Sequence, residues 1–550
     1  MPRKNKIRMA NHDLSFCLLY LAALSFTVFA AAGTQGAASV YYACVPLAFC
    51  LLFLAALIFG GSDIVAKQVG LRMRRGKIGD AMLFYRSARL STFLFSFIPA
   101  VIFGCLCVQT ATALGERYSY LAILSLLPAL VFGSQLGPSL GFLLSVGLSG
   151  VVRFLLGFLS AATVVITLIL TAFASGKAAG IGLLLRKHQL IYVYAGAGLG
   201  LGISAALTLT FLISAVLCFL VSRNIKSREE PLAIDRDEHL SEVLPYYCRL
   251  LLPSLVPAIL AAVLFYIDYR IGFAGYAGDG SHAINMNTFG GFFGGCLPVL
   301  LLAACLVFAP FSAMPARFYR LLFNQKKKTM RYEFSMTLRL LAYLGIPVSL
   351  FLFGAAKPII QICHSGFGQA AKDGAILSLK LSCGSAFLLA MAFFWILLLL
   401  ATGYQAVLLV SFVIGAVVQT AAYVLLLSVL PFPIEASGLA LFFFLLAFNL
   451  SALILGRREL LAQTDLSFLQ DYVLILLAGI VALIPVELLN DFMTYEIIPV
   501  GGVILLAIVY TVLYMLFSIL FQAADLLNVS QIPGGKYVCL FAKLLGVIRE

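Results

Sequence analysis

The sequence predicts an all-α integral membrane protein with about fourteen transmembrane helices. Hydrophobic residues make up 62% of the 550 residues and charged residues only 11%, whereas soluble domains have about 45–50% and 25%. Apolar runs of about 20 residues, the length that spans a bilayer as a helix, recur along almost the whole chain. Because these runs exceed the roughly ten-residue strands of a membrane barrel, we expect helices rather than strands.

The apolar runs divide the chain into groups of six, six and two predicted spans. The first six lie near 14–33, 40–61, 90–112, 119–147, 150–173 and 191–222. Six more lie near 246–273, 285–312, 338–356, 376–401, 404–430 and 434–455, and the last two near 470–489 and 498–523. We therefore predict an N-terminal six-helix lobe at 1–222, a charged cytoplasmic linker at 223–245, a C-terminal six-helix lobe at 246–456, and two additional helices with a cytoplasmic tail at 457–550.

Basic residues gather in every second loop, which sets the predicted orientation. One basic loop follows the second span and another follows the eighth; they contain Arg72, Arg74, Arg75 and Lys77, and Lys326, Lys327 and Lys328. Short loops rich in Lys and Arg stay in the cytoplasm, so both termini are expected there. The main exception is the loop near 174–190, where Lys177, Arg186, Lys187 and His188 fall on the predicted outside.

The two basic loops also indicate an internal repeat. They occupy equivalent places in the two halves, and each is followed by an amphipathic stretch, AMLFYRSARL or RYEFSMTLRL, that continues into the next span. Both halves begin on the inside, so the repeats are expected to be parallel and related by an axis along the membrane normal. This is a transporter architecture, with a substrate path between halves and alternating access by rocking of one half against the other.

The remaining composition excludes several classes of function. The formal net charge is +14, but the cations lie in short loops between apolar runs, so we expect no nucleic-acid partner. Most of the twelve cysteines lie inside apolar runs, where they act as small packing residues, and we expect no metal site. The chain contains no GxxxxGK[ST] and no H-E-x-x-H motif. We therefore predict that the protein is not an enzyme and uses no cofactor.

Diffuse motifs resemble those of the multidrug/oligosaccharidyl-lipid/polysaccharide (MOP) flippase superfamily, and within it the polysaccharide-biosynthesis branch that includes stage V sporulation protein B and the lipid II flippase MurJ. Gly61-Ser-Asp-Ile-Val-Ala-Lys-Gln-Val, followed by Arg75-Gly-Lys-Ile-Gly-Asp-Ala, is similar to the stretch after the second span in that branch. The segment 341–363 resembles its ninth span, and Ala401-Thr-Gly-Tyr-Gln its turn between the tenth and eleventh spans. The two additional spans also fit this branch.

The resemblance implies translocation of a lipid-linked (undecaprenyl-pyrophosphate) oligosaccharide or peptidoglycan precursor across the bacterial cytoplasmic membrane. The expected partners are this lipid-linked sugar, anionic membrane lipids at the basic loops and envelope-synthesis proteins. Two alternatives stay open. One is a drug or small-solute antiporter of the same superfamily, which the sparse intramembrane carboxylates disfavour. The other is a non-transporting partner of an envelope-synthesis complex, which the absence of charge from residues 14–33 favours, since the first span of the family usually carries arginines.

Ionisable residues inside spans are the candidates for the substrate path, because each costs about 2.5–3.5 kcal/mol on insertion scales. Asp268 and Arg270 fall near the outer end of the seventh predicted span, Arg153 at the start of the fifth, and Lys380 just inside the tenth. Gln135 is a weaker candidate in the fourth. For each residue the alternative is a local partner or snorkelling to the interface. A cation that faces a cavity would suit a substrate pyrophosphate, whose oxygens accept charge-assisted hydrogen bonds.

Glycine and proline residues inside the spans predict local bends. They occur as Gly137-Pro138, as Pro253 with Pro257, and as Gly290-Gly291 with Gly294-Gly295. Such breaks bend helices around a cavity in membrane transporters, and glycine also permits close helix packing.

Overall fold

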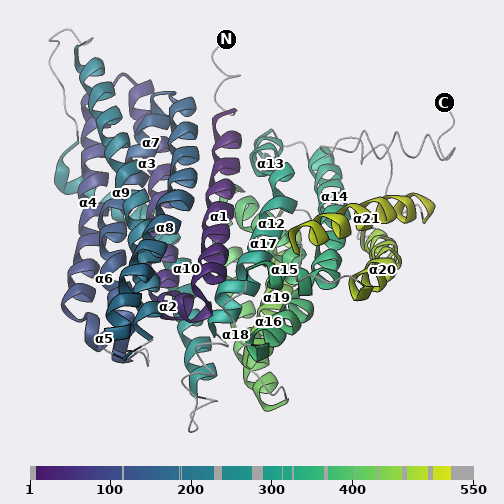
Figure 1. Cartoon of the computed structure of the whole chain (residues 1–550). Coiled ribbons are helices and arrows are strands. Elements are labelled where there is room, and N and C mark those ends of the chain that lie inside the picture. The colour runs from purple at the N-terminus through teal and green to yellow at the C-terminus, as the bar shows by residue number, and fades with distance from the viewer. Residues whose placement is uncertain are drawn as a thin grey trace. The chain divides into compact units, whose positions relative to one another are not determined.

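The structure, a computed structural model, describes residues 8–113, 117–184, 186–187, 189–227, 238–274, 289–312, 314–324, 327–363, 369–402, 404–429, 433–460, 468–492 and 499–521 (Figure 1). Within these ranges every regular element is a helix. Thirteen helices there are long and apolar enough to cross a membrane, and a bent pair brings the number to as many as fourteen. The predicted all-α fold with about fourteen spans is therefore confirmed.

The chain forms two compact units, with boundaries at Ser25/Phe26 and Ala274/Gly275. The first boundary falls inside α1 (Arg8–Gln35). Unit 2, residues 26–274, contains α2 (Ala37–Ala55), η1 (Ala56–Gly60), α3 (Gly61–Arg74), α4 (Ile78–Cys105), α5 (Cys107–Ala113), η2 (Arg117–Ser119), α6 (Tyr120–Pro128), η3 (Ala129–Gly133), α7 (Leu136–Ser145), α8 (Ser149–Leu184), α9 (Gln189–Ser227) and α10 (Leu240–Ala274).

Unit 1 contains residues 1–25 and 275–550. Its helices are η4 (Phe292–Cys296), α12 (Leu297–Phe308), η5 (Ala309–Phe311), α13 (Met314–Phe323), α14 (Lys327–Gly354), α15 (Ala356–Cys363), α16 (Gln369–Ser382), α17 (Ser385–Thr402), α18 (Gln405–Val429), α19 (Pro433–Leu460), α20 (Phe468–Phe492) and α21 (Pro499–Leu520).

The division into units differs from the predicted lobes, because the seventh span, α10, packs within unit 2. Its Tyr247 hydroxyl is 3.0 Å from the Thr92 hydroxyl of α4, and its Tyr269 hydroxyl is 3.3 Å from that of Tyr41 on α2. The predicted lobes group helices by their place in a sequence repeat, whereas the two compact units group helices that pack against one another. The two six-helix repeats therefore stay a prediction.

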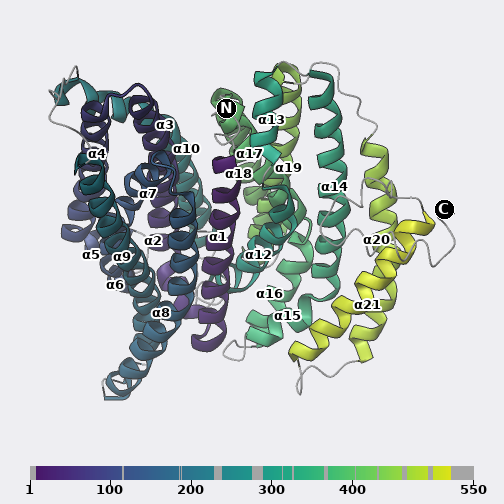
Figure 2. The ribbon, with the colours of Figure 1, turned by 90° about the horizontal axis from the view of Figure 1, so that it is seen from above.

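Small residues bring α8 and α9 into close contact in unit 2, where the two helices lie side by side (Figures 1 and 2). A Cβ atom at Gly202 of α9 would lie 2.3 Å from the Cα of Thr167 on α8, and one at Gly198 would lie 2.8 Å from the Cα of Thr171. Glycine thus lets two backbones approach to a separation that any side chain would prevent.

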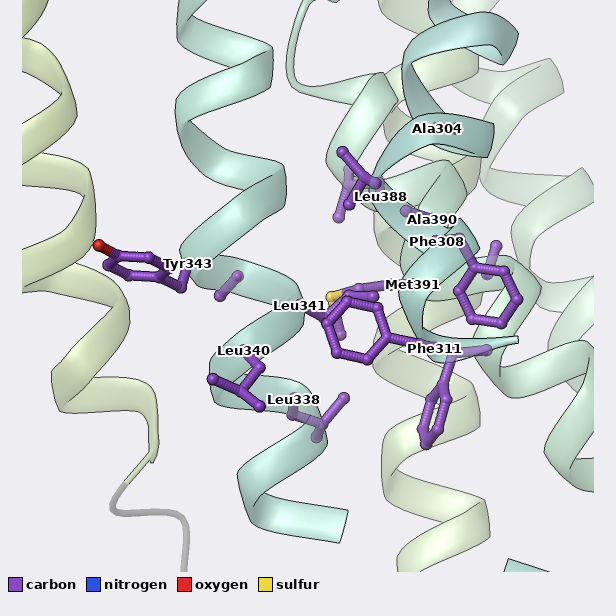
Figure 3. Packing of buried hydrophobic residues seen from close by; sticks show 14 of the residues in the cluster. Ala304, Phe308, Phe311, Leu338, Leu340, Leu341, Tyr343, Leu388, Ala390 and Met391 are labelled. Atoms are coloured by element: carbon purple, nitrogen blue, oxygen red, sulfur yellow. The ribbon is translucent and has the colours of Figure 1, made fainter. Parts of the chain in front are cut away.

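A cluster of buried aliphatic and aromatic residues forms the core of unit 1 (Figure 3). Phe308 and Phe311 pack near Leu341 and Met391, which come from α14 and α17. Tyr343 projects from another side of α14. It contacts α21, because the Tyr514 hydroxyl donates to the Tyr343 carbonyl oxygen over 2.9 Å.

The two C-terminal helices pack directly on the rest of unit 1. Arg339 of α14 forms an ion pair with Asp471 of α20 at 2.8 Å, and the neighbouring Tyr472 hydroxyl donates to the Leu338 carbonyl oxygen over 3.1 Å. A Cβ at Gly479 would lie 2.5 Å from the Leu350 side chain. The helices α20 and α21 are thus held on α14 by both polar and close apolar contacts.

Helix starts differ from the predicted spans where polar residues continue a helix beyond its apolar run. The third span was predicted from residue 90, but α4 begins at Ile78; α14 begins at Lys327 rather than near 338. Both amphipathic stretches therefore continue into the following span, as predicted. The helix α8 runs to Leu184, well beyond the predicted end at 173, so much of the exceptional basic loop is helical.

The predicted breaks have three different outcomes. Gly294 and Gly295 lie in the π-turn η4, and Gly137-Pro138 lies in the first turn of α7, which begins three residues after the π-turn η3 ends. Pro253 and Pro257 lie within the single helix α10. Since a π-turn inserts a residue into the helical hydrogen-bond ladder, η3 and η4 are real local distortions.

Candidate functional site

The helix pair at the predicted tenth span is sharply bent, and its break is the strongest candidate site in unit 1. Its two apolar segments, Lys372–Ser382 and Ser385–Leu400, meet at an angle of 53°. Cys383 and Gly384 lie between them. Interrupted backbone at membrane depth is tolerated where protein or a cavity satisfies its polar groups, and membrane transporters build substrate sites at such helices.

Neighbouring helices supply hydrogen-bond partners on both sides of this break. The Phe387 N–H, in the first turn of α17, donates to the Ser349 hydroxyl of α14 over 3.1 Å. On the other side, the Ser382 hydroxyl is 3.3 Å from the Cys296 thiol of the π-turn η4. The buried Ser385 hydroxyl has no hydrogen-bond partner among the described residues. The break is therefore a supported polar region inside an apolar helix bundle.

Close packing fixes the bend. A Cβ at Gly384 would lie 2.8 Å from the Phe442 ring of α19, and a Cβ at Gly345 of α14 would lie 2.5 Å from the Phe387 ring. A larger residue at either glycine would push the neighbouring aromatic ring away. The angle between the two segments therefore depends on close packing against α14 and α19.

Lys380 lies less than one helical turn before the break. Its Nζ is 3.5 Å from Oε1 of Glu487 on α20 and 5.0 Å from the centre of the Phe353 ring of α14. The side chains of Lys380 and Glu487 keep 28% and 30% of their accessible surface. A lysine within an apolar span thus has a carboxylate partner, an aromatic face and remaining accessible surface.

A second polar region lies at one end of unit 2, around Arg72 of α3. The Arg72 guanidinium holds the Glu238 carboxylate through Nε and a terminal nitrogen, at 2.9–3.1 Å. It also lies 4.6 Å from the centre of the Phe84 ring. Asp80 is buried and accepts from the Glu238 N–H at 3.4 Å, while its Oδ2 has no partner among the described residues. These contacts fix the described end of the linker against α3 and α4.

The π-turns of unit 2 adjoin its buried polar groups. The turns η1 and η3 share the sequence Ala-Leu-x-Phe-Gly. A Cβ at Gly137 would lie 2.4 Å from the Leu57 carbonyl oxygen of η1. Just after η3, the Ser134 hydroxyl donates to the Ser96 hydroxyl of α4 over 2.9 Å. Irregular turns, buried hydroxyls and close backbone contact therefore coincide in one part of unit 2.

The predicted path residues have different local environments. Gln135 follows η3, is 5% exposed and has an Nε2 group without a partner among the described residues. Among the described residues, Arg153 bonds only to its own helix, through the Ser149 carbonyl and hydroxyl oxygens at 3.3 and 3.4 Å. Arg270 is exposed on α10, and the Asp268 side chain lies outside the described residues. Lys380 lies in unit 1. The role of each in a substrate path stays a prediction.

The basic-loop residues have different environments. Arg74, the last residue of α3, and Arg75 and Lys77 in the turn that follows are exposed, whereas Arg72 is held by Glu238. In the second basic loop Lys328 is exposed, and Lys326 and the Lys327 side chain lie outside the described residues. Their predicted contact with anionic lipid stays a prediction.

Several residues of these polar regions were not predicted from the sequence. Glu487 and Glu238 were not singled out, and Asp80 was quoted only as part of the motif that begins at Arg75. The partners in the ion pairs Lys380–Glu487 and Arg72–Glu238 are 107 and 166 positions apart. No local pattern links residues at such separations; the one available signal was that each charge adjoins an apolar run.

Comparison with known proteins gives matches of structure. No protein-family model matches the sequence, and no curated protein matches it. The lipid II flippase MurJ, in an inward closed conformation, aligns over 92% of this chain and 96% of its own, with a TM-score of 0.59 and 12% identity. A multidrug resistance MATE family transporter of the MOP superfamily covers 82% of this chain and 96% of its own, with a TM-score of 0.56 and 15% identity.

A further match is a MOP superfamily transporter from Pyrococcus furiosus, which covers 83% of this chain and 94% of its own, with a TM-score of 0.52 and 13% identity. These matches establish that the chain has the fold of MOP superfamily transporters. The resemblance inferred from the sequence is confirmed at the level of the fold.

Proposed function

We propose that this multi-pass membrane protein, which has the fold of MOP superfamily transporters, is a divergent flippase that moves a lipid-linked oligosaccharide or peptidoglycan precursor across the bacterial cytoplasmic membrane. The proposed substrate class is an undecaprenyl-pyrophosphate saccharide, and the proposed orientation has both termini in the cytoplasm. We propose anionic membrane lipids and envelope-synthesis proteins as its further partners.

The observation that supports a flippase over an antiporter is the extent of the structural match. The MurJ match covers 92% of this chain, whereas the MATE transporter and the Pyrococcus furiosus transporter cover 82% and 83%. This difference is of the size of α20 and α21 together, which have 25 and 22 residues. Those two helices pack on α14, so they belong to the transporter body of unit 1.

The chemistry of the described residues also favours an anionic lipid substrate. Proton- or sodium-coupled export of small solutes relies on carboxylates inside the spans. Here Glu487 is paired with Lys380 and Asp471 with Arg339. A cation in an apolar span suits a phosphate-bearing lipid, because phosphate oxygens accept charge-assisted hydrogen bonds. The broken tenth span supplies the polar, supported region that a transported headgroup needs.

Depletion of the protein in its own cell tests this function. A flippase predicts that the lipid-linked saccharide accumulates in the cytoplasmic leaflet, measured by labelling each leaflet separately, with unchanged export of cationic dyes and drugs. Normal leaflet distribution together with lost dye export would instead identify a drug antiporter. Normal distribution with loss of a partner enzyme from the membrane would identify a non-transporting partner. Either result would overturn the proposal.

A further inference from the structure

The ion pair between Lys380 and Glu487 is longer than the other ion pairs among the described residues. It has one contact, at 3.5 Å, whereas strong charge-assisted N–H···O bonds measure about 2.7–2.9 Å. The pairs of Arg317 with Glu333 and of Arg339 with Asp471 measure 2.6 and 2.8 Å. The remaining donors of Lys380 have no hydrogen-bond acceptor among the described residues. This lysine therefore retains capacity for a further anion.

Exposed apolar residues flank both members of the pair. Leu377 and Leu381 lie three residues before and one residue after Lys380 on α16, and they are 43% and 37% exposed. Ile484 and Leu488 have the same spacing around Glu487 on α20 and are 57% and 58% exposed. Leu377 and Leu381 are four residues apart and share a helix face, as do Ile484 and Leu488, so each charge adjoins an exposed apolar stripe. A ligand matching this surface combines an anionic head with an apolar chain.

We propose that Lys380 binds the pyrophosphate of a polyprenyl-pyrophosphate lipid, with Glu487 as an internal counter-ion that the ligand displaces. This inference rests on the proposed function and locates an anion site for its substrate class. A ligand must outcompete one carboxylate that is already near the lysine. A pyrophosphate carries more than one negative charge, whereas a bulk phospholipid diester carries one, so the pyrophosphate is favoured.

Glu487 belongs to α20, so the proposed site includes a residue of the two additional helices. Glu487 lies near the end of α20, whereas Asp471 and Tyr472 hold the start of that helix on α14. Binding of the anion at Lys380 replaces the carboxylate contact between α16 and α20, while the ion pair at the start of α20 is unaffected. The helices beyond the first twelve spans thus supply the group that keeps the site neutral when it is empty.

Binding to the full-length protein in nanodiscs tests the proposal, with undecaprenyl pyrophosphate as the probe. Glu487→Gln removes the internal counter-ion and is expected to lower Kd about 3- to 10-fold, whereas Lys380→Gln raises it at least about 10-fold. Lys380→Arg keeps the charge and is expected to keep binding. Asp471→Asn is the matched control, because it breaks an ion pair of the same helix away from the site and leaves Kd unchanged.

Equal affinity in the wild type and Glu487→Gln, or full binding by Lys380→Gln that still unfolds cooperatively, would overturn the site. A Glu487→Gln gain for phosphatidylglycerol as large as that for undecaprenyl pyrophosphate would overturn the choice of ligand. Failure of this site and failure of the proposed function are distinguishable. If all variants bind equally well and the protein translocates the lipid-linked saccharide, only the site is refuted. If the variants bind as expected but the protein does not translocate the lipid-linked saccharide, only the proposed function is refuted.

Discussion

Replacing Gly202 by alanine tests the backbone contact between α8 and α9. The added Cβ would lie 2.3 Å from the Thr167 Cα, and the obstacle is backbone that has no rotamer to change. To restore an ordinary contact of about 3.5 Å, the helices must separate by about 1 Å, and overpacking of this kind costs about 1–3 kcal/mol. Alanine also gains about 1 kcal/mol of helix propensity over glycine. The net destabilisation expected is therefore as much as about 2 kcal/mol.

Gly180→Ala in α8 is the matched control, since a Cβ there meets nothing within 4 Å. This variant gains the helix propensity without the clash, so it is expected to be neutral or stabilised by up to about 1 kcal/mol. The unfolding midpoint of each purified variant in the same detergent measures the difference. A Gly202→Ala protein as stable as Gly180→Ala would refute the close approach of the two backbones.

Three further experiments probe other parts of the structure. Arg72 and Glu238 are replaced singly and together in a double-mutant cycle. The coupling free energy from thermal unfolding is expected to be about 1 kcal/mol, because the guanidinium holds the carboxylate through two nitrogens. Additive effects on stability would contradict the pairing. Arg186 has a φ of 52°, so Arg186→Gly is expected to raise stability by roughly 0.5–1 kcal/mol, and a lowered midpoint would argue against that backbone. Tyr343→Phe removes a buried bond of 3.1 Å to the Ser518 hydroxyl and is expected to cost about 0.5–1.5 kcal/mol; an unchanged midpoint would count against it.

The spans were predictable because a bilayer imposes one length and one composition on each. Most predicted ends lie within a few residues of the helix ends, as in 404–430 against Gln405–Val429 for α18. The exceptions arise where the helix outlasts the apolar run. Arg86 and Arg89 lower the hydropathy at the start of α4, and small and basic residues after 173 lower it at the end of α8, so both helix ends were predicted too far inside the helix. Hydropathy indicates which part of a helix lies in the apolar layer of the membrane, whereas backbone hydrogen bonding decides where the helix ends.

The polar regions were predictable only in part. Lys380 and Gln135 were found because a polar group inside an apolar run is locally visible. Glu487 was missed as a partner because it appears at the end of a span, where a carboxylate needs no explanation. The bend at Cys383-Gly384 was also missed, since the run 376–401 is continuous in hydropathy, and the angle depends on contacts from α14 and α19.

Reconstitution tests the central claim most directly. Purified protein in liposomes that contain a lipid-linked undecaprenyl-pyrophosphate saccharide is predicted to speed the appearance of the saccharide on the opposite face, measured with a membrane-impermeant enzyme or label. Protein-free liposomes give the background rate, and liposomes containing a cationic dye in place of the saccharide give the rate for a small solute. Accelerated movement of the saccharide alone is the predicted result. A saccharide rate equal to the background, in vesicles whose protein remains folded, would contradict the proposed flippase.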